Sequence, residues 1–190
     1  MLFRSEFDEV FDESLQTLTT GLDNLNLVVR RFSDFARMPA PEFSQVALNE
    51  IVQEAVQLFR AQAEAPGRPG ITVAVGLDPA IGSIRADPDQ LRRALQNLLL
   101  NAIDAMPSGG TLTVSTRRAD GSARIDVSDT GDGLTDEERQ RLFTPYYTTK
   151  THGTGLGLAI VQSVVADHNG KIWVDSERGN GTTFHIELPS

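Results

Sequence analysis

The 190-residue sequence contains no cysteine, only one tryptophan and two tyrosines, and no apolar run near the length of a membrane span. The lack of cysteine excludes a disulfide scaffold, a thiol nucleophile and a cysteine-ligated zinc site. A helix that crosses a bilayer needs about 20 apolar residues in succession, and the sequence shows no signal-peptide pattern either. We therefore expect a soluble protein of the reducing cytoplasm.

Basic side chains are also scarce, because 17 lysines and arginines stand against 26 acids, which gives a formal net charge of −9. With a pI near 4.8, the chain has no excess of positive charge for phosphate backbones. This balance argues against a nucleic-acid binder that works by bulk charge. The length suits one ordinary domain with an appendage.

Proline is absent between Glu6 and Met38, and glycine occurs there once. The apolar residues of this stretch follow one another at alternating steps of four and three: Phe11, Leu15, Leu18, Leu22, Leu25, Val29, Phe32 and Ala36. Such steps are typical of the seam of a heptad repeat. We expect a long helix that pairs with other helices and ends before Pro39; the alternative is a surface helix packed on its own domain.

The rest of the chain predicts a compact domain of helices and strands. Asp87 and Pro88 are strong helix-start signals, with Gln90 placed to reach back to the cap, and Thr135 with Glu138 makes a capping box. The expected helices are 46–65, 87–106, 135–143 and 155–168. The expected strands are 71–75, 111–117, 123–129, 171–175 and 182–188, the second and third of them joined as a hairpin.

Asn97, Asn101 and Asp104 stand at i, i+4 and i+7 of the helix that starts at Asp87, along one edge of its apolar stripe. Asparagine is a mediocre helix former, so two carboxamides beside a core call for an explanation. Either they hydrogen-bond a neighbouring loop, or they offer oxygen ligands to a hard cation such as Mg²⁺ that carries phosphates.

Asp129 has the same strand parity as Ile125 and Val127, so its carboxylate should point to the buried face. A buried charge needs a partner, and two glycines, Gly131 and Gly133, follow at once. The carboxylate accepts hydrogen bonds either from its own loop or from the amino group of a purine that lies against the sheet.

Glycines at positions 153, 155 and 157 open the last predicted helix. Backbone N–H groups at a helix N-terminus form an anion site, although a flexible hinge is the alternative. The glycine spacing and context match neither the dinucleotide fingerprint nor a Walker loop.

Five segments in order resemble the N, G1, F, G2 and G3 boxes of the sensor histidine kinases. They are 97–102 (NLLLNA), 129–133 (DTGDG), 142–150 (LFTPYYTTK), 153–157 (GTGLG) and 179–184 (GNGTTF). The F and N segments look most like the nitrogen-regulation branch. Segment 30–39 (RRFSDFARMP) is similar to the end of the second dimerisation helix in that branch.

The resemblance implies an α+β fold, a Bergerat-type α/β sandwich with helices on one face of a mixed sheet, preceded by the heptad helix. Residues 1–40 would be the second helix of a dimerisation and histidine-phosphotransfer bundle, without its acceptor helix, and residues 41–190 the ATP-binding catalytic domain. The implied activity is transfer of the ATP γ-phosphoryl group to a histidine. The implied partners are ATP, a response regulator receiver domain and a second copy of the chain, in the cytoplasm or in the cytoplasmic part of a membrane-anchored sensor.

The resemblance also implies residue roles. Asn101 would coordinate a Mg²⁺ ion that bridges the ATP phosphates, with Asn97 beside it as the second catalytic asparagine. Asp129 would bind the adenine amino group, and the lid, residues 143–157, would hold the phosphates. The expected nucleotide-binding residues are Asn97, Asn101, Asp104, Asp129, Gly131, Gly133, Lys150, Gly153, Thr154, Gly155, Leu156, Gly157 and Thr182.

Departures from the family pattern leave two alternatives open. The family often has Lys-Tyr where this chain has Asp104 and Ala105, so Lys150, Arg92 or Arg93 must supply the phosphate-contacting charge. Related ATPases place a water-activating glutamate at the position of Asn97, which cannot accept a proton at neutral pH. A Bergerat-fold ATPase is therefore disfavoured, and a non-catalytic nucleotide-binding dimer module is the other alternative.

The chain has three histidines, and none is followed by the acid and proline of the family's acceptor helix. His152 falls in the lid, His168 ends a predicted helix before an αL cap, and His185 is expected to face solvent from the outer side of the last strand. We therefore expect that this chain alone does not complete histidine autophosphorylation.

Overall fold

The computed structural model describes residues 39–63, 70–119, 121–150 and 153–190, together with residues 11, 14–16, 18, 19, 21 and 22. The residues of the last group are helical. Leu25, Val29, Phe32 and Ala36 of the seam, and His152 of the lid, lie outside the described residues. Within the described ranges, no helix has both the length and the apolar character that a bilayer span requires.

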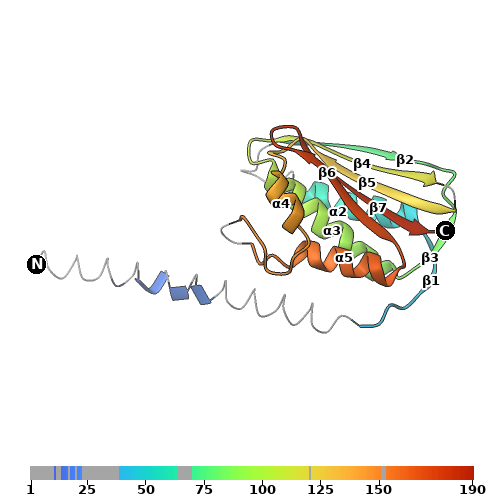
Figure 1. The fold of residues 1–190 in the computed structure, drawn as a ribbon, viewed down its shortest axis with the longest axis horizontal. Coiled ribbons are helices and arrows are strands. Elements are labelled where there is room, and N and C mark those ends of the chain that lie inside the picture. The colour runs from blue at the N-terminus through green and yellow to red at the C-terminus, as the bar shows by residue number, and fades with distance from the viewer. Residues whose placement is uncertain are drawn as a thin grey trace, which may run out of the picture.

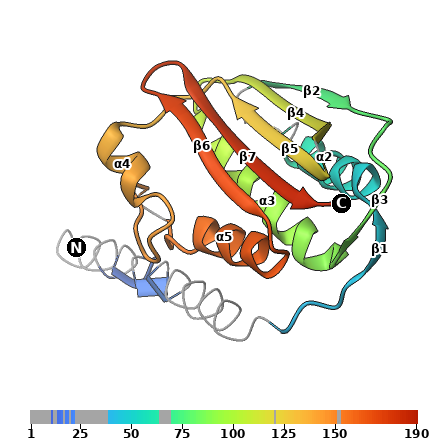
Figure 2. The ribbon, with the colours of Figure 1, turned by 45° about the vertical axis from the view of Figure 1, so that its right-hand side comes forward.

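A five-stranded mixed sheet carries three helices on one face (Figures 1 and 2). In sheet order the strands are β2 (Ile71–Leu77), β4 (Gly110–Ala119), β5 (Ser122–Asp129), β7 (Gly181–Pro189) and β6 (Lys171–Glu177). The covering helices are α2 (Leu48–Ala63), α3 (Pro88–Ala105) and α5 (Gly157–Asp167), and the short α4 (Asp136–Arg141) lies at one end. Only β2 and β4 run parallel; the other neighbours are antiparallel. The predicted α+β sandwich is confirmed.

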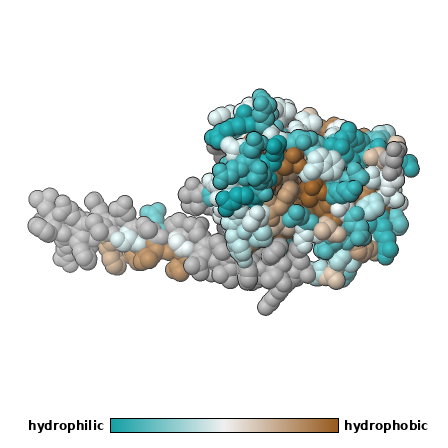
Figure 3. Space-filling view, in the orientation of Figure 1, coloured by the Kyte–Doolittle hydropathy of each residue, from teal (hydrophilic) through white to brown (hydrophobic). Residues whose placement is uncertain are grey.

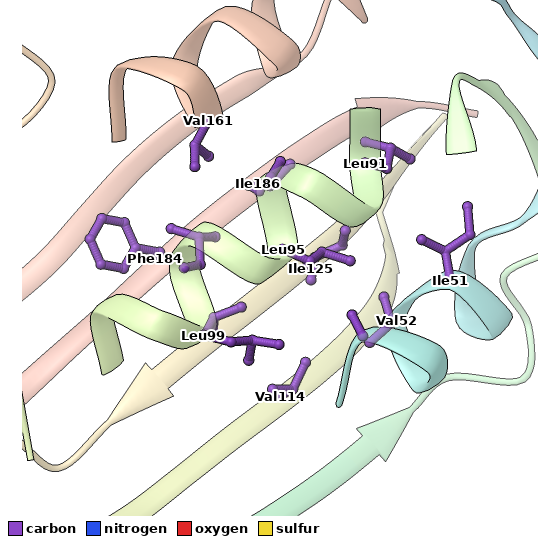
Figure 4. Packing of buried hydrophobic residues seen from close by; sticks show 14 of the residues in the cluster. Ile51, Val52, Leu91, Leu95, Leu99, Val114, Ile125, Val161, Phe184 and Ile186 are labelled. Carbon is purple, nitrogen blue, oxygen red and sulfur yellow. The ribbon is translucent and has the colours of Figure 1, made fainter. Parts of the chain in front are cut away.

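The core lies between the sheet and α3, the central helix (Figure 4). Leu95 and Leu99 of α3 are buried against Ile125 of β5, because a 3.6-residue period sets one apolar stripe of the helix against the alternate residues of each strand. Val52 of α2 and Val161 of α5 close the layer on either side of α3. The sheet and the two flanking helices therefore hold α3 in place.

A second, two-stranded sheet was not predicted. It pairs β1 (Ser44–Ala47) with β3 (Ser83–Ala86) in antiparallel register, with Val46 opposite Ile84. The prediction of a helix from residue 46 was wrong, because α2 begins at Leu48. Four-residue strands carry too little alternation to be recognised, and these two find each other only through the tertiary fold.

Asp87 caps α3 as predicted, and it also fastens the preceding segment to the domain. Its Oδ1 accepts hydrogen bonds from the backbone amides of Asp89 (2.9 Å) and Gln90 (3.0 Å), and its Oδ2 accepts one from Glu42 (2.8 Å). Burial opposes ionisation, but the three amides outweigh it and hold the pKa of Asp87 below its usual value. A single carboxylate thus ties residue 42 to the start of α3.

The Gln90 side chain does not reach back to the cap, so that prediction was wrong. Gln90 Nε2 donates to the carbonyl of Pro39 at 3.1 Å. The Asp87 N–H instead donates to Nε2 of the buried His168 at 2.9 Å, while His168 Nδ1 donates to the Val164 carbonyl at 2.7 Å. Both ring nitrogens are therefore hydrogen-bonded, and His168 connects the start of α3 to the end of α5. The predicted αL cap follows at Asn169, with φ of 55°.

His185 lies on the outer side of the sheet, but the expectation that it faces solvent was wrong. Only 7% of the residue is exposed, because the Trp173 ring stacks on it with centroids 5.1 Å apart. Its Nδ1 lies 2.6 Å from Asp126 Oδ1, and its Nε2 lies 3.0 Å from Asp175 Oδ2. Large neighbours on adjacent strands cover the imidazole, which strand parity alone does not reveal.

Candidate functional site

The C-terminal half of α3 presents the two asparagines and Asp104 along one edge. Asn97 Nδ2 donates to the carbonyl of Arg93, one turn earlier, at 2.8 Å. Its Oδ1 faces the start of α5, where a Cβ on Gly157 would come within 2.9 Å of that oxygen. Glycine at position 157 therefore lets α5 approach α3 closely enough for the two helices to share a site.

Lys150, a residue of the lid, lies at this edge. Its Nζ donates to Asn101 Oδ1 at 3.1 Å and to Asp104 Oδ2 at 2.9 Å. Arg92, the second candidate, is engaged near the start of α3 by Glu54 and Asp89, each at 2.9 Å. Lys150 thus lies beside Asn101 and Asp104 in the structure, although it comes from the lid.

Asp129 ends β5 with its carboxylate buried, as predicted, and with only 6% of the residue exposed. Burial raises the pKa of Asp129 above its ordinary value, although bonds from the backbone amides of Gly131 and Thr182 and the charge of Lys150 oppose the rise. The Gly131 amide lies 2.9 Å from Oδ1. A partly satisfied carboxylate in a dry position suits a ligand that donates a further N–H.

The two glycines after Asp129 are required by close backbone contacts. A Cβ on Gly131 would collide with the carbonyl oxygen of Ala105 at the end of α3. Gly133 has φ of +63°, and a Cβ there would collide with the carbonyl oxygen of Glu177. The Asp132 amide donates to the Ala105 carbonyl at 3.0 Å, so this loop is held against the end of α3.

A backbone hydrogen bond joins the two ends of the lid just before α5. The Tyr146 amide donates to the Gly155 carbonyl at 3.0 Å, and both residues have positive φ, 66° and 65°. Leu156 is fully buried at the start of α5, where it is the N-cap residue and forms no side-chain capping hydrogen bond. The first-turn amides of α5, with no acid beside them, are oriented for an anion.

Ser176 of β6 is a site residue that the sequence did not suggest. Its Oγ lies 3.0 Å from Thr182 Oγ1 and accepts a hydrogen bond from the Leu134 amide at 2.9 Å. It thereby joins the loop after Asp129 to the buried Thr182. A serine in a strand carries no sequence signal of such a role, because only the register of β6 and β7 brings it there.

The structure brings the predicted residues together around one end of α3. They come from α3 itself, from the ends of β5 and β7, and from the lid and the start of α5. In the space-filling view, apolar surface is visible in a recess between the hydrophilic α4 and β6 (Figure 3). The arrangement brings a buried acceptor, Asp129, and the N-terminus of α5 to α3.

The described residues include no group of three or more histidine, aspartate or glutamate side chains that could hold a metal ion by themselves. Asn101 Oδ1 nevertheless accepts a hydrogen bond from a cation, the Lys150 ammonium group. Mg²⁺ commonly takes one or two protein oxygens and completes its shell with phosphates and waters. The residues present therefore fit a Mg²⁺ ion that arrives with a nucleotide.

Residues 86–190, more than half of the chain, match the family described as histidine kinase-, DNA gyrase B- and HSP90-like ATPase. The chain belongs to this family. Its domain is the histidine kinase type of this ATPase domain, and ATP is the substrate that the family implies. The Bergerat fold predicted from the five segments is thereby confirmed.

Among the curated relatives of this ATPase domain, the sensor histidine kinase ZraS of Klebsiella oxytoca is 40% identical over 168 residues. That alignment covers 88% of this chain and 36% of ZraS. The nitrogen regulation protein NtrY of Azorhizobium caulinodans is 36% identical over 188 residues, which are 95% of this chain and 24% of NtrY. The chain thus spans about a quarter to a third of the length of these relatives.

Solved structures agree with the ATPase domain in fold. The catalytic domain of histidine kinase ThkA superposes with a TM-score of 0.70 at 32% identity, over 78% of this chain and 95% of that one. Full-length ShkA in complex with AMPPNP superposes with a TM-score of 0.77 at 30% identity, over 92% of this chain and 37% of ShkA. ThkA in complex with the response regulator TrrA superposes with a TM-score of 0.74 at 26% identity, over 90% of this chain and 48% of that one.

Proposed function

We propose that this chain is the ATP-binding catalytic part of a sensor histidine kinase, which transfers the γ-phosphoryl group of ATP to a histidine of an acceptor helix outside the chain. The observation that carries the proposal is the convergence of buried Asp129, Asn101 and the uncapped start of α5 at one site. The asparagine at position 97 argues against the ATPase alternative, because it offers no base to activate water.

Each part of the site has a role in this proposal. Asp129 accepts the adenine amino group, with Thr182 beside it and Gly131 and Gly133 shaping the pocket. The residues from 153 to 157, including Thr154 and Leu156, hold the phosphates through backbone amides at the start of α5. Residues 41–190 form this catalytic domain, and residues 1–40 are the second helix of a dimerisation bundle.

Phosphoryl transfer requires positioning and charge neutralisation more than covalent help from the protein. Asn101 and Asn97 stand on a rigid helix, so they orient the phosphate end of the nucleotide. A Mg²⁺ ion bound through Asn101 would neutralise phosphate charge. The lid would exclude water, which favours transfer to an imidazole over hydrolysis. Lys150 would add a positive charge that stabilises the phosphoryl group in transfer.

Asn101→Ala tests the site directly. We expect it to weaken Mg-ADP binding by about 10- to 100-fold, the loss that follows when one bond to a charged group is removed. Binding of ADP without Mg²⁺ should change little. Calorimetric titration of the parent and the variant, with and without Mg²⁺, measures both effects.

Gln96→Ala is the matched control, because Gln96 is an exposed neighbour on the same helix. It should bind Mg-ADP like the parent. The proposal fails if the parent does not bind Mg-ADP, or if Asn101→Ala binds it as the parent does.

The N-terminal helix is proposed to make a homodimer. Leu15, Leu18 and Leu22 are exposed by 46%, 64% and 63%, and Figure 3 shows apolar side chains gathered on one side of this segment. We expect Leu18→Gln with Leu22→Gln to shift the chain toward monomer in sedimentation, because buried leucines stabilise a helical seam. Leu58→Gln, at an exposed leucine of α2, should leave association unchanged. A parent that is monomeric at high concentration would contradict the dimer.

Phosphoryl transfer should require a histidine that another polypeptide supplies. His168 and His185 are buried and hydrogen-bonded, so neither can reach a γ-phosphate from its place in the fold. With γ-labelled ATP, we expect acid-labile label only after addition of an acceptor helix that bears a histidine. Stoichiometric label on the chain alone, lost on replacing His152, His168 or His185, would refute this prediction.

A response regulator receiver domain is the proposed recipient of the phosphoryl group, in a cytoplasmic signalling pathway. The support is the likeness to ThkA, which was solved in complex with a response regulator protein. The sensor that the chain serves is proposed to be either cytoplasmic or anchored in a membrane through segments outside this chain.

A further inference from the structure

Lys150 and a Mg²⁺ ion would need the same oxygen atom. The Lys150 ammonium group occupies Asn101 Oδ1 at 3.1 Å while it pairs with Asp104 Oδ2 at 2.9 Å. Mg²⁺ requires its ligands at about 2.1 Å in nearly ideal octahedral geometry. A cation already hydrogen-bonded to that oxygen obstructs this approach and repels the ion. Asn101 Oδ1 has a second lone pair, but the ammonium group beside it disfavours the ion, so the two arrangements compete.

We propose that Lys150, Asn101 and Asp104 form a clasp that holds lid residues 146–150 to α3 and opposes the binding of Mg-nucleotide until it opens. This inference rests on the proposed function of the site and adds a regulatory step to it. Opening of the clasp frees the ammonium group for the phosphates and frees Asn101 for the metal. Asp104 acts as a positioning residue, because it sets how tightly Lys150 is held.

The clasp connects two segments that lie far apart in the sequence. Lys150 lies 49 residues from Asn101, and its backbone is bound into the lid. Its amide donates to Thr148 Oγ1 at 3.1 Å, and its carbonyl accepts from the Gly153 amide at 3.1 Å. When the ammonium group is held at α3, this turn of the lid is held with it.

The clasp is weak enough to be reversible. The Lys150 and Asp104 side chains are 39% and 53% exposed, and exposed ion pairs shift an equilibrium by about fivefold at most. A nucleotide phosphate group carries more negative charge than one carboxylate, so it competes successfully for the lysine. The apparent nucleotide affinity equals the affinity of the open form multiplied by the fraction of molecules in which the clasp is open.

Two other roles for Asp104 give different results. If Asp104 supported the metal, its loss would weaken Mg-ADP binding. If it merely repelled phosphates, its loss would tighten binding whether or not Lys150 is present. If Asp104 acts through the clasp, removal of its charge tightens Mg-ADP binding only while Lys150 is present.

The experiment is a double-mutant cycle with Asp104→Asn, Lys150→Met and the double variant, titrated with Mg-ADP at constant ionic strength. We expect Asp104→Asn to tighten binding by about two- to fivefold in the parent and by less than about 1.5-fold in the Lys150→Met background. Glu54→Gln, which removes an exposed ion pair with Arg92, is the matched control and should have no effect. Weaker binding on Asp104→Asn, or equal tightening in both backgrounds, overturns the clasp.

Hydrogen exchange separates failure of the clasp from failure of the proposed function. Without nucleotide, Asp104→Asn should speed amide exchange in lid residues 146–150 by about two- to fivefold. Unchanged lid exchange overturns the clasp even if Mg-ADP binds normally. A parent that fails to bind Mg-ADP overturns the proposed function instead, while lid exchange still reports on the contact.

Discussion

Asp129→Asn should abolish adenine nucleotide binding and at the same time stabilise the fold. The amide offers a donor where the adenine amino group also donates, so we expect affinity to fall on the order of a hundredfold or more, with or without Mg²⁺. The substitution also removes a buried charge, which should raise the free energy of unfolding by about 1 kcal/mol. Nucleotide titration and urea unfolding of the same sample measure the two effects.

The sign of the pH dependence follows from the raised pKa of Asp129. Because the ionised form accepts the amino group, nucleotide binding should weaken as the pH falls through a value above the ordinary 3.8. Stability moves the other way: protonated Asp129 favours the folded state, and this contribution is lost as the pH rises through that pKa. In Asp129→Asn both dependences should disappear. Parent binding that stays constant down to the acid limit of the fold would contradict the assignment.

Gly131→Ala should be a strongly damaging small substitution in the site. Its Cβ would collide with a backbone carbonyl, that of Ala105, which cannot turn away as a flexible side chain could. We expect a loss of about 2–4 kcal/mol in the free energy of unfolding, because overpacking against backbone shifts the loop away from α3. Nucleotide binding should fall with it, since the loop carries Asp129.

Gly82→Ala is the control, because a Cβ there meets no atom within 4 Å. It should change stability by less than about 0.5 kcal/mol. Urea unfolding compares the two variants, and equal stabilities would show that the loop and the end of α3 can separate without cost.

The sequence predicts α3 and its functional edge well because several local signals agree. An aspartate cap, a proline in the first turn and a regular apolar stripe all favour the same helix, and they place Asn97 and Asn101 on one side of it. Strand parity likewise predicts that Asp129 is buried. Such signals are local, so a single sequence contains them.

The features that could not be predicted depend on contacts between distant segments. The pairing of β1 with β3, the covering of His185 by Trp173 and the bond from Gln90 to Pro39 all need the finished fold. The contact of Lys150 with Asn101 and Asp104 is of the same kind. A lysine in a loop can reach many places, and only the path of the lid brings it to α3.

Residues 39–42 are hydrogen-bonded to the start of α3, so the incoming chain and this helix are directly connected. Asp87 and Gln90 grip the incoming chain at one end, and the asparagines and the glycine loop lie toward the other. An 18-residue helix is a stiff rod about 27 Å long. Asp87 and Gln90 therefore couple the incoming chain directly to the helix that carries Asn97, Asn101 and Asp104.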